Sequence, residues 1–148
     1  MTNLPSTAPI QGFVGKFLNY EKALDRLLEV IVKVREEPDN DFYRDALIQR
    51  YEFTWELAWK TLKEYMEEIS LDFESNPRSV LKKAFQQDYI QDEELWLQSI
   101  KGRNLLAHTY DEVTANIVAS DIINIYNQAF VDLYNKLKTI YDTEYNIK

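Results

Sequence analysis

The sequence contains no cysteine, only three glycines and four prolines, and a single histidine. Without cysteine, disulfides and thiolate metal sites are excluded, which fits a reducing compartment, and we expect the protein to be cytoplasmic. So few glycines and prolines disfavour an all-β protein, because turns between strands use many of both. One histidine cannot supply a zinc site or the two Glu-x-x-His motifs of a carboxylate-bridged di-metal bundle, so we expect no metal and no cofactor.

Long apolar runs are also missing from the chain. No stretch of about 18 uncharged apolar residues occurs, so we expect no membrane-spanning helix. Residues 1–12 are polar and lack the basic start of a signal peptide, which predicts a flexible leader followed by one domain over residues 13–148. A glycine-rich phosphate-binding loop is absent too, so we do not expect the chain to bind a nucleotide by itself in that way.

The net charge of −8 argues against a protein whose whole surface binds nucleic acid. The distribution of charge is uneven. Residues 77–103 carry five basic and four acidic side chains, whereas the stretches on both sides are acidic. This pattern permits a local anion-binding site within a generally acidic protein.

Apolar residues recur at steps of three and four along most of the chain, which is typical of amphipathic helices. The second of the expected helices has two apolar stripes, which predicts contacts with more than one neighbour. The expected helices cover residues 13–35, 41–70, a short stretch from 77, a stretch that starts at about 92, and 112–141. The sequence therefore predicts an all-α protein, an antiparallel up-and-down four-helix bundle with one short extra helix.

Residues 103–112 (RNLLAHTYDE) hold the only histidine and form the candidate site. Asn104 and His108 are spaced four apart, so they can form a hydrogen bond that fixes the imidazole tautomer. An arginine such as Arg103 can hold a phosphate while His108 moves a proton, which is what metal-independent cleavage of an RNA backbone requires. The alternative is structural, with Arg103 paired to a carboxylate and His108 satisfying a helix end. The spacing alone favours this alternative, because Arg103 and His108 are poorly aligned on a regular helix.

The surroundings of this segment add two expectations. On a helical projection the polar residues prolong the face of Trp96, Leu97 and Ile100, while other apolar residues lie on other sides. A helix that is apolar on most sides is covered by more than one surface, which predicts a dimer interface there. Two pairs of glutamates on the second helix are interpreted as solvated charges: Glu52 with Glu56, and Glu64 with Glu68.

Residues 103–112 resemble the signature of the nucleotidyltransferase substrate-binding proteins, which belong to the HEPN superfamily of helical bundles. Residues 46–63 (ALIQRYEFTWELAWKTLK) and 76–85 (NPRSVLKKAF) resemble the same family, and the matches run in order over about residues 17–137. The resemblance implies a homodimer and a separately encoded minimal nucleotidyltransferase as partner. That partner would supply the nucleotide and metal chemistry.

Related pairs act as toxin–antitoxin modules in which the HEPN protein is an RNase toxin. The resemblance then implies that Arg103 and His108 are catalytic, that Asn104 supports them, and that Tyr110 is adenylylated by the partner as the neutralising step. Gly102 stands where this subfamily is expected to have an acidic residue, so the local charge is more positive. Two functions follow: a companion subunit of the nucleotidyltransferase or, as the alternative, a metal-independent ribonuclease toxin that acts on RNA.

Overall fold

The computed structural model describes residues 12–108 and 111–146, and for residues 105–108 it describes the backbone alone. Every regular element in this part of the chain is a helix, and none of these helices is long and apolar enough to cross a membrane. The elements are α1 (Gly12–Glu36), α2 (Asp41–Glu68), α3 (Pro77–Gln86), α4 (Glu93–His108), α5 (Glu112–Asp121), η1 (Ile122–Tyr126), α6 (Asn127–Ile140) and η2 (Tyr141–Tyr145), of which η1 and η2 are π-helical. The all-α prediction is confirmed.

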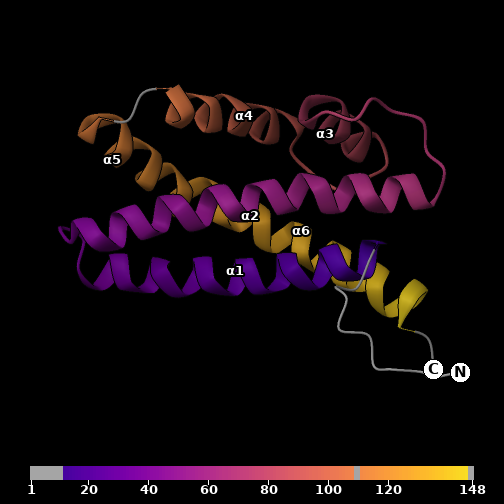
Figure 1. Ribbon diagram of the computed structural model, residues 1–148, viewed down its shortest axis with the longest axis horizontal. Helices are drawn as coiled ribbons and strands as arrows, with labels where there is room; N and C mark the ends of the chain where they lie inside the picture. Colours follow the sequence, from indigo (N-terminus) through magenta and orange to yellow (C-terminus); the bar gives the residue numbers. More distant parts are fainter. Residues whose placement is uncertain (1–11, 109–110, 147–148) are drawn as a thin grey trace, which may run out of the picture.

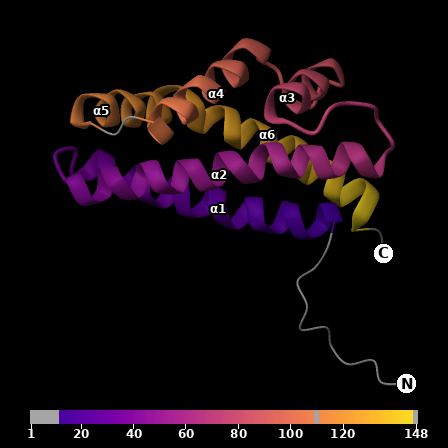
Figure 2. The ribbon, with the colours of Figure 1, turned by 45° about the horizontal axis from the view of Figure 1, so that its top comes forward.

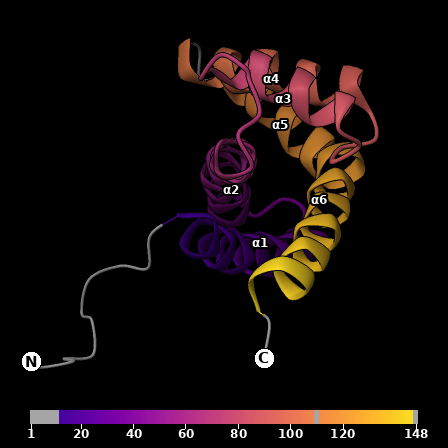
Figure 3. The same cartoon turned by 90° about the vertical axis from the view of Figure 1, so that its right-hand side faces the viewer.

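The helices alternate in direction, as an up-and-down bundle requires. Helices α1 and α2 lie antiparallel and side by side, and α4 returns above α2 after the short α3 (Figure 1). The stretch from α5 to η2 is one nearly continuous helix that crosses behind α2 obliquely (Figure 2). Viewed along the bundle, α2 lies between α1 below it and α4 above it, with α6 on one side (Figure 3). The predicted bundle of four long helices with one short insertion is therefore confirmed.

Asparagine side chains cap the starts of α2 and α3. The side chain of Asn40 accepts the backbone N–H of Tyr43 at 3.1 Å at the start of α2. Asn76 caps α3 in the same way, and the proline that follows occupies the first turn, where its missing N–H costs nothing. The end of α2 lies before the predicted residue 70, because Ser70 adopts the left-handed backbone conformation with φ of 64°.

Aromatic side chains from α1, α2 and α6 pack together within a largely aliphatic core. The ring of Tyr51 stacks on Phe130 with centroids 5.5 Å apart, and the hydroxyl of Tyr20 donates to the backbone carbonyl of Phe130 at 2.7 Å. On another face of α2, Trp55 is directed to α4, where its indole N–H donates to Ser99 at 2.8 Å. Helix α2 thus contacts several neighbours, as its two apolar stripes predict.

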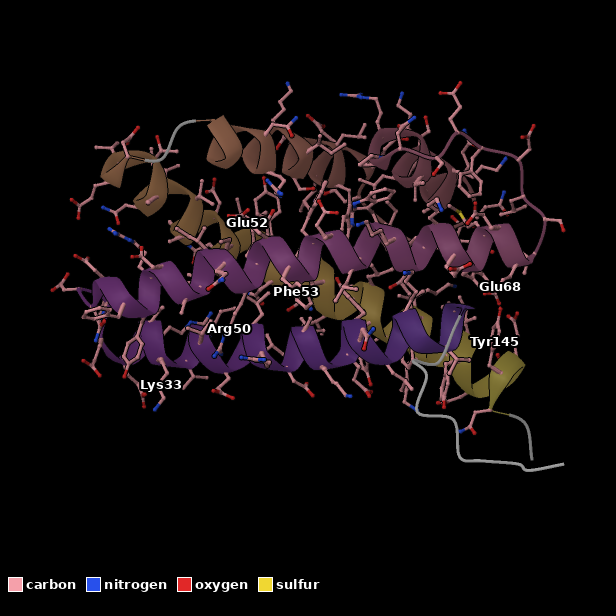
Figure 4. The ribbon with its side chains drawn as sticks, in the orientation of Figure 1. Lys33, Arg50, Glu52, Phe53, Glu68 and Tyr145 are labelled. Atoms are coloured by element: carbon pink, nitrogen blue, oxygen red, sulfur yellow. The ribbon has the colours of Figure 1, made fainter. Side chains whose placement is uncertain are left out.

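Glu68 corrects one sequence-based expectation. Its carboxylate accepts the backbone N–H of Phe13 at 2.7 Å and the hydroxyl of Tyr145 at 3.0 Å, so it is not simply a solvated charge. Figure 4 shows Glu68 and Tyr145 at the same end of the bundle, on α2 and η2. The hydrogen bonds of Glu68 therefore hold the start of α1 and the end of the last helix against α2.

Candidate functional site

A buried hydrogen-bond chain positions α4 against α2 just before the candidate site. The indole of Trp55 donates to the hydroxyl of Ser99, which in turn donates to the backbone carbonyl of Trp96 at 2.5 Å. All three side chains are buried, so the polar atoms satisfy one another away from water. Because Ser99 lies about one helical turn before Arg103, this contact directs Arg103 towards α2.

Arg103 is held between two carboxylates of α2. One guanidinium nitrogen lies 3.5 Å from Oε2 of Glu52, and another lies 3.9 Å from Oε1 of Glu56. Figure 4 shows Glu52 rising from α2 towards α4. The three side chains are only one quarter to one third exposed, so the interpretation of Glu52 and Glu56 as solvated charges is wrong. Among the described residues, Arg103 is therefore paired with carboxylates, as the structural alternative expected.

One donor of the Arg103 guanidinium, the buried Nε, has no hydrogen-bond partner in the part of the chain that the structure describes. The nearby hydroxyl of Tyr51 is also buried without a partner there. Burial raises the pKa of Tyr51, while the positive charge of Arg103 lowers it to a smaller extent. Tyr51 therefore stays a neutral phenol at any physiological pH and does not act as a base.

The far end of the candidate segment is also attached to α2. Arg44 contacts Glu112 at 3.3 Å and donates a hydrogen bond to Asn116 at 3.1 Å, both on α5. Asp111 caps α5 by accepting the backbone N–H of Thr114 at 2.8 Å, and this hydrogen bond lowers the pKa of the Asp111 carboxyl. Helix α2 thus fixes the chain on both sides of residues 104–110.

The remaining predicted site residues are placed less fully. Asn104 is exposed on α4, and His108 is the last residue of that helix, but the imidazole lies outside the described residues. Tyr110 also lies outside the described residues. The Asn104–His108 hydrogen bond, the catalytic roles of Arg103 and His108 and the role of Tyr110 therefore stay predictions. A Cβ atom added at Gly102 would meet no described atom within 4 Å, so this position has room for a side chain.

The helix face predicted as a dimer interface is partly used within the chain. Trp96 is buried against α6, where its ring centroid lies 5.5 Å from that of Phe130. Arg103 on the same face contacts α2. Sequence reasoning missed Glu52, Glu56 and Arg44 as neighbours of the site. The four-residue spacing of Glu52 and Glu56 indicates that they share one face of α2, but only the fold shows that this face contacts α4.

The family model "Nucleotidyltransferase substrate binding protein like" matches residues 15–139 of the chain. The chain belongs to this family. A Thermus thermophilus protein of known structure is 30% identical to this family member, with a TM-score of 0.70. The match covers 80% of this chain and 98% of the Thermus thermophilus chain. No curated protein is significantly similar in this comparison.

Two further solved structures share the fold of this nucleotidyltransferase substrate-binding-like chain. One is a Haemophilus influenzae protein described as having the fold of a substrate binding domain of a nucleotidyltransferase, with 21% identity, 82% and 98% coverage of the two chains and a TM-score of 0.74. The other is a tri-AMPylated Shewanella oneidensis HEPN toxin in complex with an MNT antitoxin, with 15% identity, 86% and 96% coverage and a TM-score of 0.69. At these identities the likeness concerns the fold alone.

Proposed function

We propose that the chain is the companion, substrate-binding subunit of a separately encoded minimal nucleotidyltransferase, acting as a homodimer in a cytoplasmic two-protein module of the toxin–antitoxin type. The match of the family model to residues 15–139 is the observation that carries this proposal. Because the sequence has no glycine-rich phosphate loop, the partner would supply the nucleotide and metal chemistry. The acidic chain offers charge complementarity to a basic catalytic partner.

Exposed apolar side chains at the start of α5 support the homodimer. Val113 and Ile117 lie one turn apart on α5 and are 69% and 57% exposed. Val113 directly follows the candidate segment, so a second copy that covers this part of α5 would lie beside the C-terminal end of that segment. Exposed apolar groups that gather beside a candidate site are typical of a surface that another protein covers.

Co-expression with the product of the neighbouring gene, which the proposal expects to be a nucleotidyltransferase, tests the companion role. We expect the two proteins to purify together, with the chain present as a dimer. A double Val113→Ser, Ile117→Ser variant should shift the chain towards monomer in sedimentation, whereas Val32→Ser, at a similarly exposed position on α1, should not. A wild-type chain that is strictly monomeric and retains no nucleotidyltransferase would contradict the proposal.

The second candidate function is a metal-independent ribonuclease toxin, favoured by Arg103 lying half-buried on α4, five residues before His108. Arg103 would hold the scissile phosphate, His108 would move the proton, and Asn104 would hold the imidazole tautomer. Tyr110 would accept AMP from the partner as the neutralising step. The comparison with a tri-AMPylated HEPN toxin, a protein of the same fold, supports this candidate.

The toxin candidate has its own experiment. Expression of the wild-type chain without its partner should slow growth and degrade RNA, and His108→Ala should abolish both effects. Mass measurement after co-expression should show an increase matching whole AMP groups that Tyr110→Phe removes, while Tyr43→Phe, outside the segment, leaves it intact. A wild-type chain that is harmless and cleaves no RNA would refute the toxin candidate and leave the companion role standing.

A further inference from the structure

A groove between α1 and α2 has a basic lining, although the chain as a whole is acidic. It has a volume of about 640 Å³, within the range of small-ligand sites. Lys22 and Arg26 line it from α1 and Arg50 lines it from α2, and no carboxylate is among its lining residues. Three cations without an acidic neighbour in the lining are unexpected in a protein of net charge −8. The groove therefore favours anions, although the chain as a whole is acidic.

One of the three cations is fixed in place and the other two are available. A guanidinium nitrogen of Arg50 donates to the backbone carbonyl of Arg26 at 2.7 Å, and the same nitrogen lies 3.7 Å from Glu29 at the edge of the groove. These contacts hold Arg50 across the gap between the two helices. Lys22 and Arg26 are exposed and form no ion pair with a described residue, so both can bind an anion at no cost in broken ion pairs.

An aromatic ring completes the lining. Phe53 is 62% exposed, although a phenylalanine on a bundle helix is usually buried. In Figure 4, Phe53 and Arg50 face the gap between α1 and α2, whereas Glu52 rises towards α4. The groove thus lies on a different side of α2 from Arg103. Two amide side chains, Asn19 and Gln49, also line it and can hydrogen-bond to a base or a sugar.

We propose that this groove binds a nucleotide unit, with the base stacked on Phe53 and the phosphate held by Lys22, Arg26 and Arg50. An exposed aromatic face beside exposed cations is the combination by which proteins bind nucleotide units without sequence preference. A plain phosphate would leave Phe53 without a role, and an apolar peptide would leave the cations unpaired. The unit can come from a free mononucleotide or from a single strand. The groove shares no residue with the candidate catalytic segment or with the exposed apolar face of α5, so its test is independent of both.

Calorimetric titration of the full chain with AMP, with inorganic phosphate and with a short single-stranded oligothymidylate tests the proposal. We expect AMP to bind measurably and inorganic phosphate to bind far more weakly. Phe53→Ala should weaken AMP binding about tenfold or more, because it removes the stacking surface. Lys22→Glu with Arg26→Glu should abolish binding of both nucleotide probes. The matched controls are Phe42→Ala, at an aromatic residue 86% exposed elsewhere on α2, and Arg78→Glu with Lys82→Glu on α3, and neither should change the affinity.

The outcomes distinguish a mononucleotide from a single strand as the ligand, and both from an acidic peptide. Equal affinity for AMP and for the oligothymidylate identifies a mononucleotide site, whereas a much tighter oligothymidylate that weakens steeply with salt identifies a single strand. The proposal is overturned if neither AMP nor the oligothymidylate binds. It is also overturned if Phe53→Ala binds like the wild type, or if polyglutamate competes equally, since the groove would then accept an acidic peptide. All substituted positions are exposed, so unchanged circular dichroism will confirm that the variants fold.

Discussion

Two buried tyrosine hydroxyls allow the stability contribution of one hydrogen bond, between helices far apart in the sequence, to be compared with an internal reference. Tyr20 on α1 is fully buried, and its hydroxyl donates to the carbonyl of Phe130 on α6 at 2.7 Å. Tyr51 on α2 is buried to the same degree, but its hydroxyl has no partner among the described residues. Changing either residue to phenylalanine removes one oxygen and leaves the ring packing in place. The two variants therefore differ only in whether that oxygen forms a hydrogen bond.

The expected changes in stability have opposite signs. Tyr20→Phe should lower the free energy of unfolding by about 0.5–1.5 kcal/mol, the net value of an intramolecular hydrogen bond. Tyr51→Phe removes a buried hydroxyl that has no partner within residues 12–104 and 111–146, so it should leave stability unchanged or raise it by about 1 kcal/mol. Burial raises the pKa of both hydroxyls, so at neutral pH no change of ionisation enters the comparison.

Urea unfolding followed by circular dichroism and by tryptophan fluorescence measures both variants. An unchanged slope of unfolding free energy against urea would show that only stability has changed. For a chain of this length, 1 kcal/mol corresponds to roughly 2–4 °C in Tm. A Tyr51→Phe variant that loses as much stability as Tyr20→Phe would refute the reasoning, because ring packing rather than the hydrogen bond would then dominate.

Three further predictions concern single positions. Gly102→Ala should raise stability by about 0.5–1 kcal/mol, measured by urea unfolding, because a Cβ there meets no described atom within 4 Å and glycine weakens a helix; destabilisation would show that the position is crowded. Burial, and then the hydrogen bond to Glu21, raises the pKa of Tyr134 to about 12, so its neutral form stabilises the fold below pH 10, and this contribution is lost as pH rises towards 12. Tyr134→Phe should flatten that alkaline loss in pH-dependent unfolding, and an unchanged profile would contradict the assignment. The pKa of Asp111 is lowered in the fold, so its ionised carboxylate stabilises the fold above the ordinary carboxyl pKa, and this contribution is lost as pH falls through the folded value. Asp111→Asn can still cap α5 but does not titrate, so it should make acid unfolding less steep.

The sequence predicts the helices and their starts because those features depend on neighbouring residues. Asn40, Asn76 and Asp111 are capping residues that satisfy backbone N–H groups three positions on, and each begins a helix as its type indicates. The π-helical stretch η1, Ile122–Tyr126, has no such local signal. It interrupts the predicted last helix where Asn127 donates its side-chain amide to the carbonyl of Ile123, and only the folded chain reveals this contact.

The partners of Arg103 lie beyond prediction from spacing. Glu52 and Glu56 precede it by about a third of the length of the chain, and their four-residue spacing alone is equally typical of solvated helix charges. What decides between the two is the approach of α4 to α2, which the buried Trp55–Ser99 hydrogen bond fixes. That approach is a tertiary property. It makes Arg103 a guanidinium already paired with carboxylates, so a phosphate that binds there must compete with both of them.

Helix α2 connects the two sites without merging them. Glu52 and Phe53 are adjacent in the sequence, and neighbouring residues on a helix point about 100° apart. One therefore reaches Arg103 on α4, while the other faces the groove beside α1. The rigid helix sets the relative position of the two sites. A strand bound in the groove could thus pass around α2 towards Arg103, whereas a mononucleotide would remain in the groove, so the groove ligand decides whether the two surfaces act on one molecule.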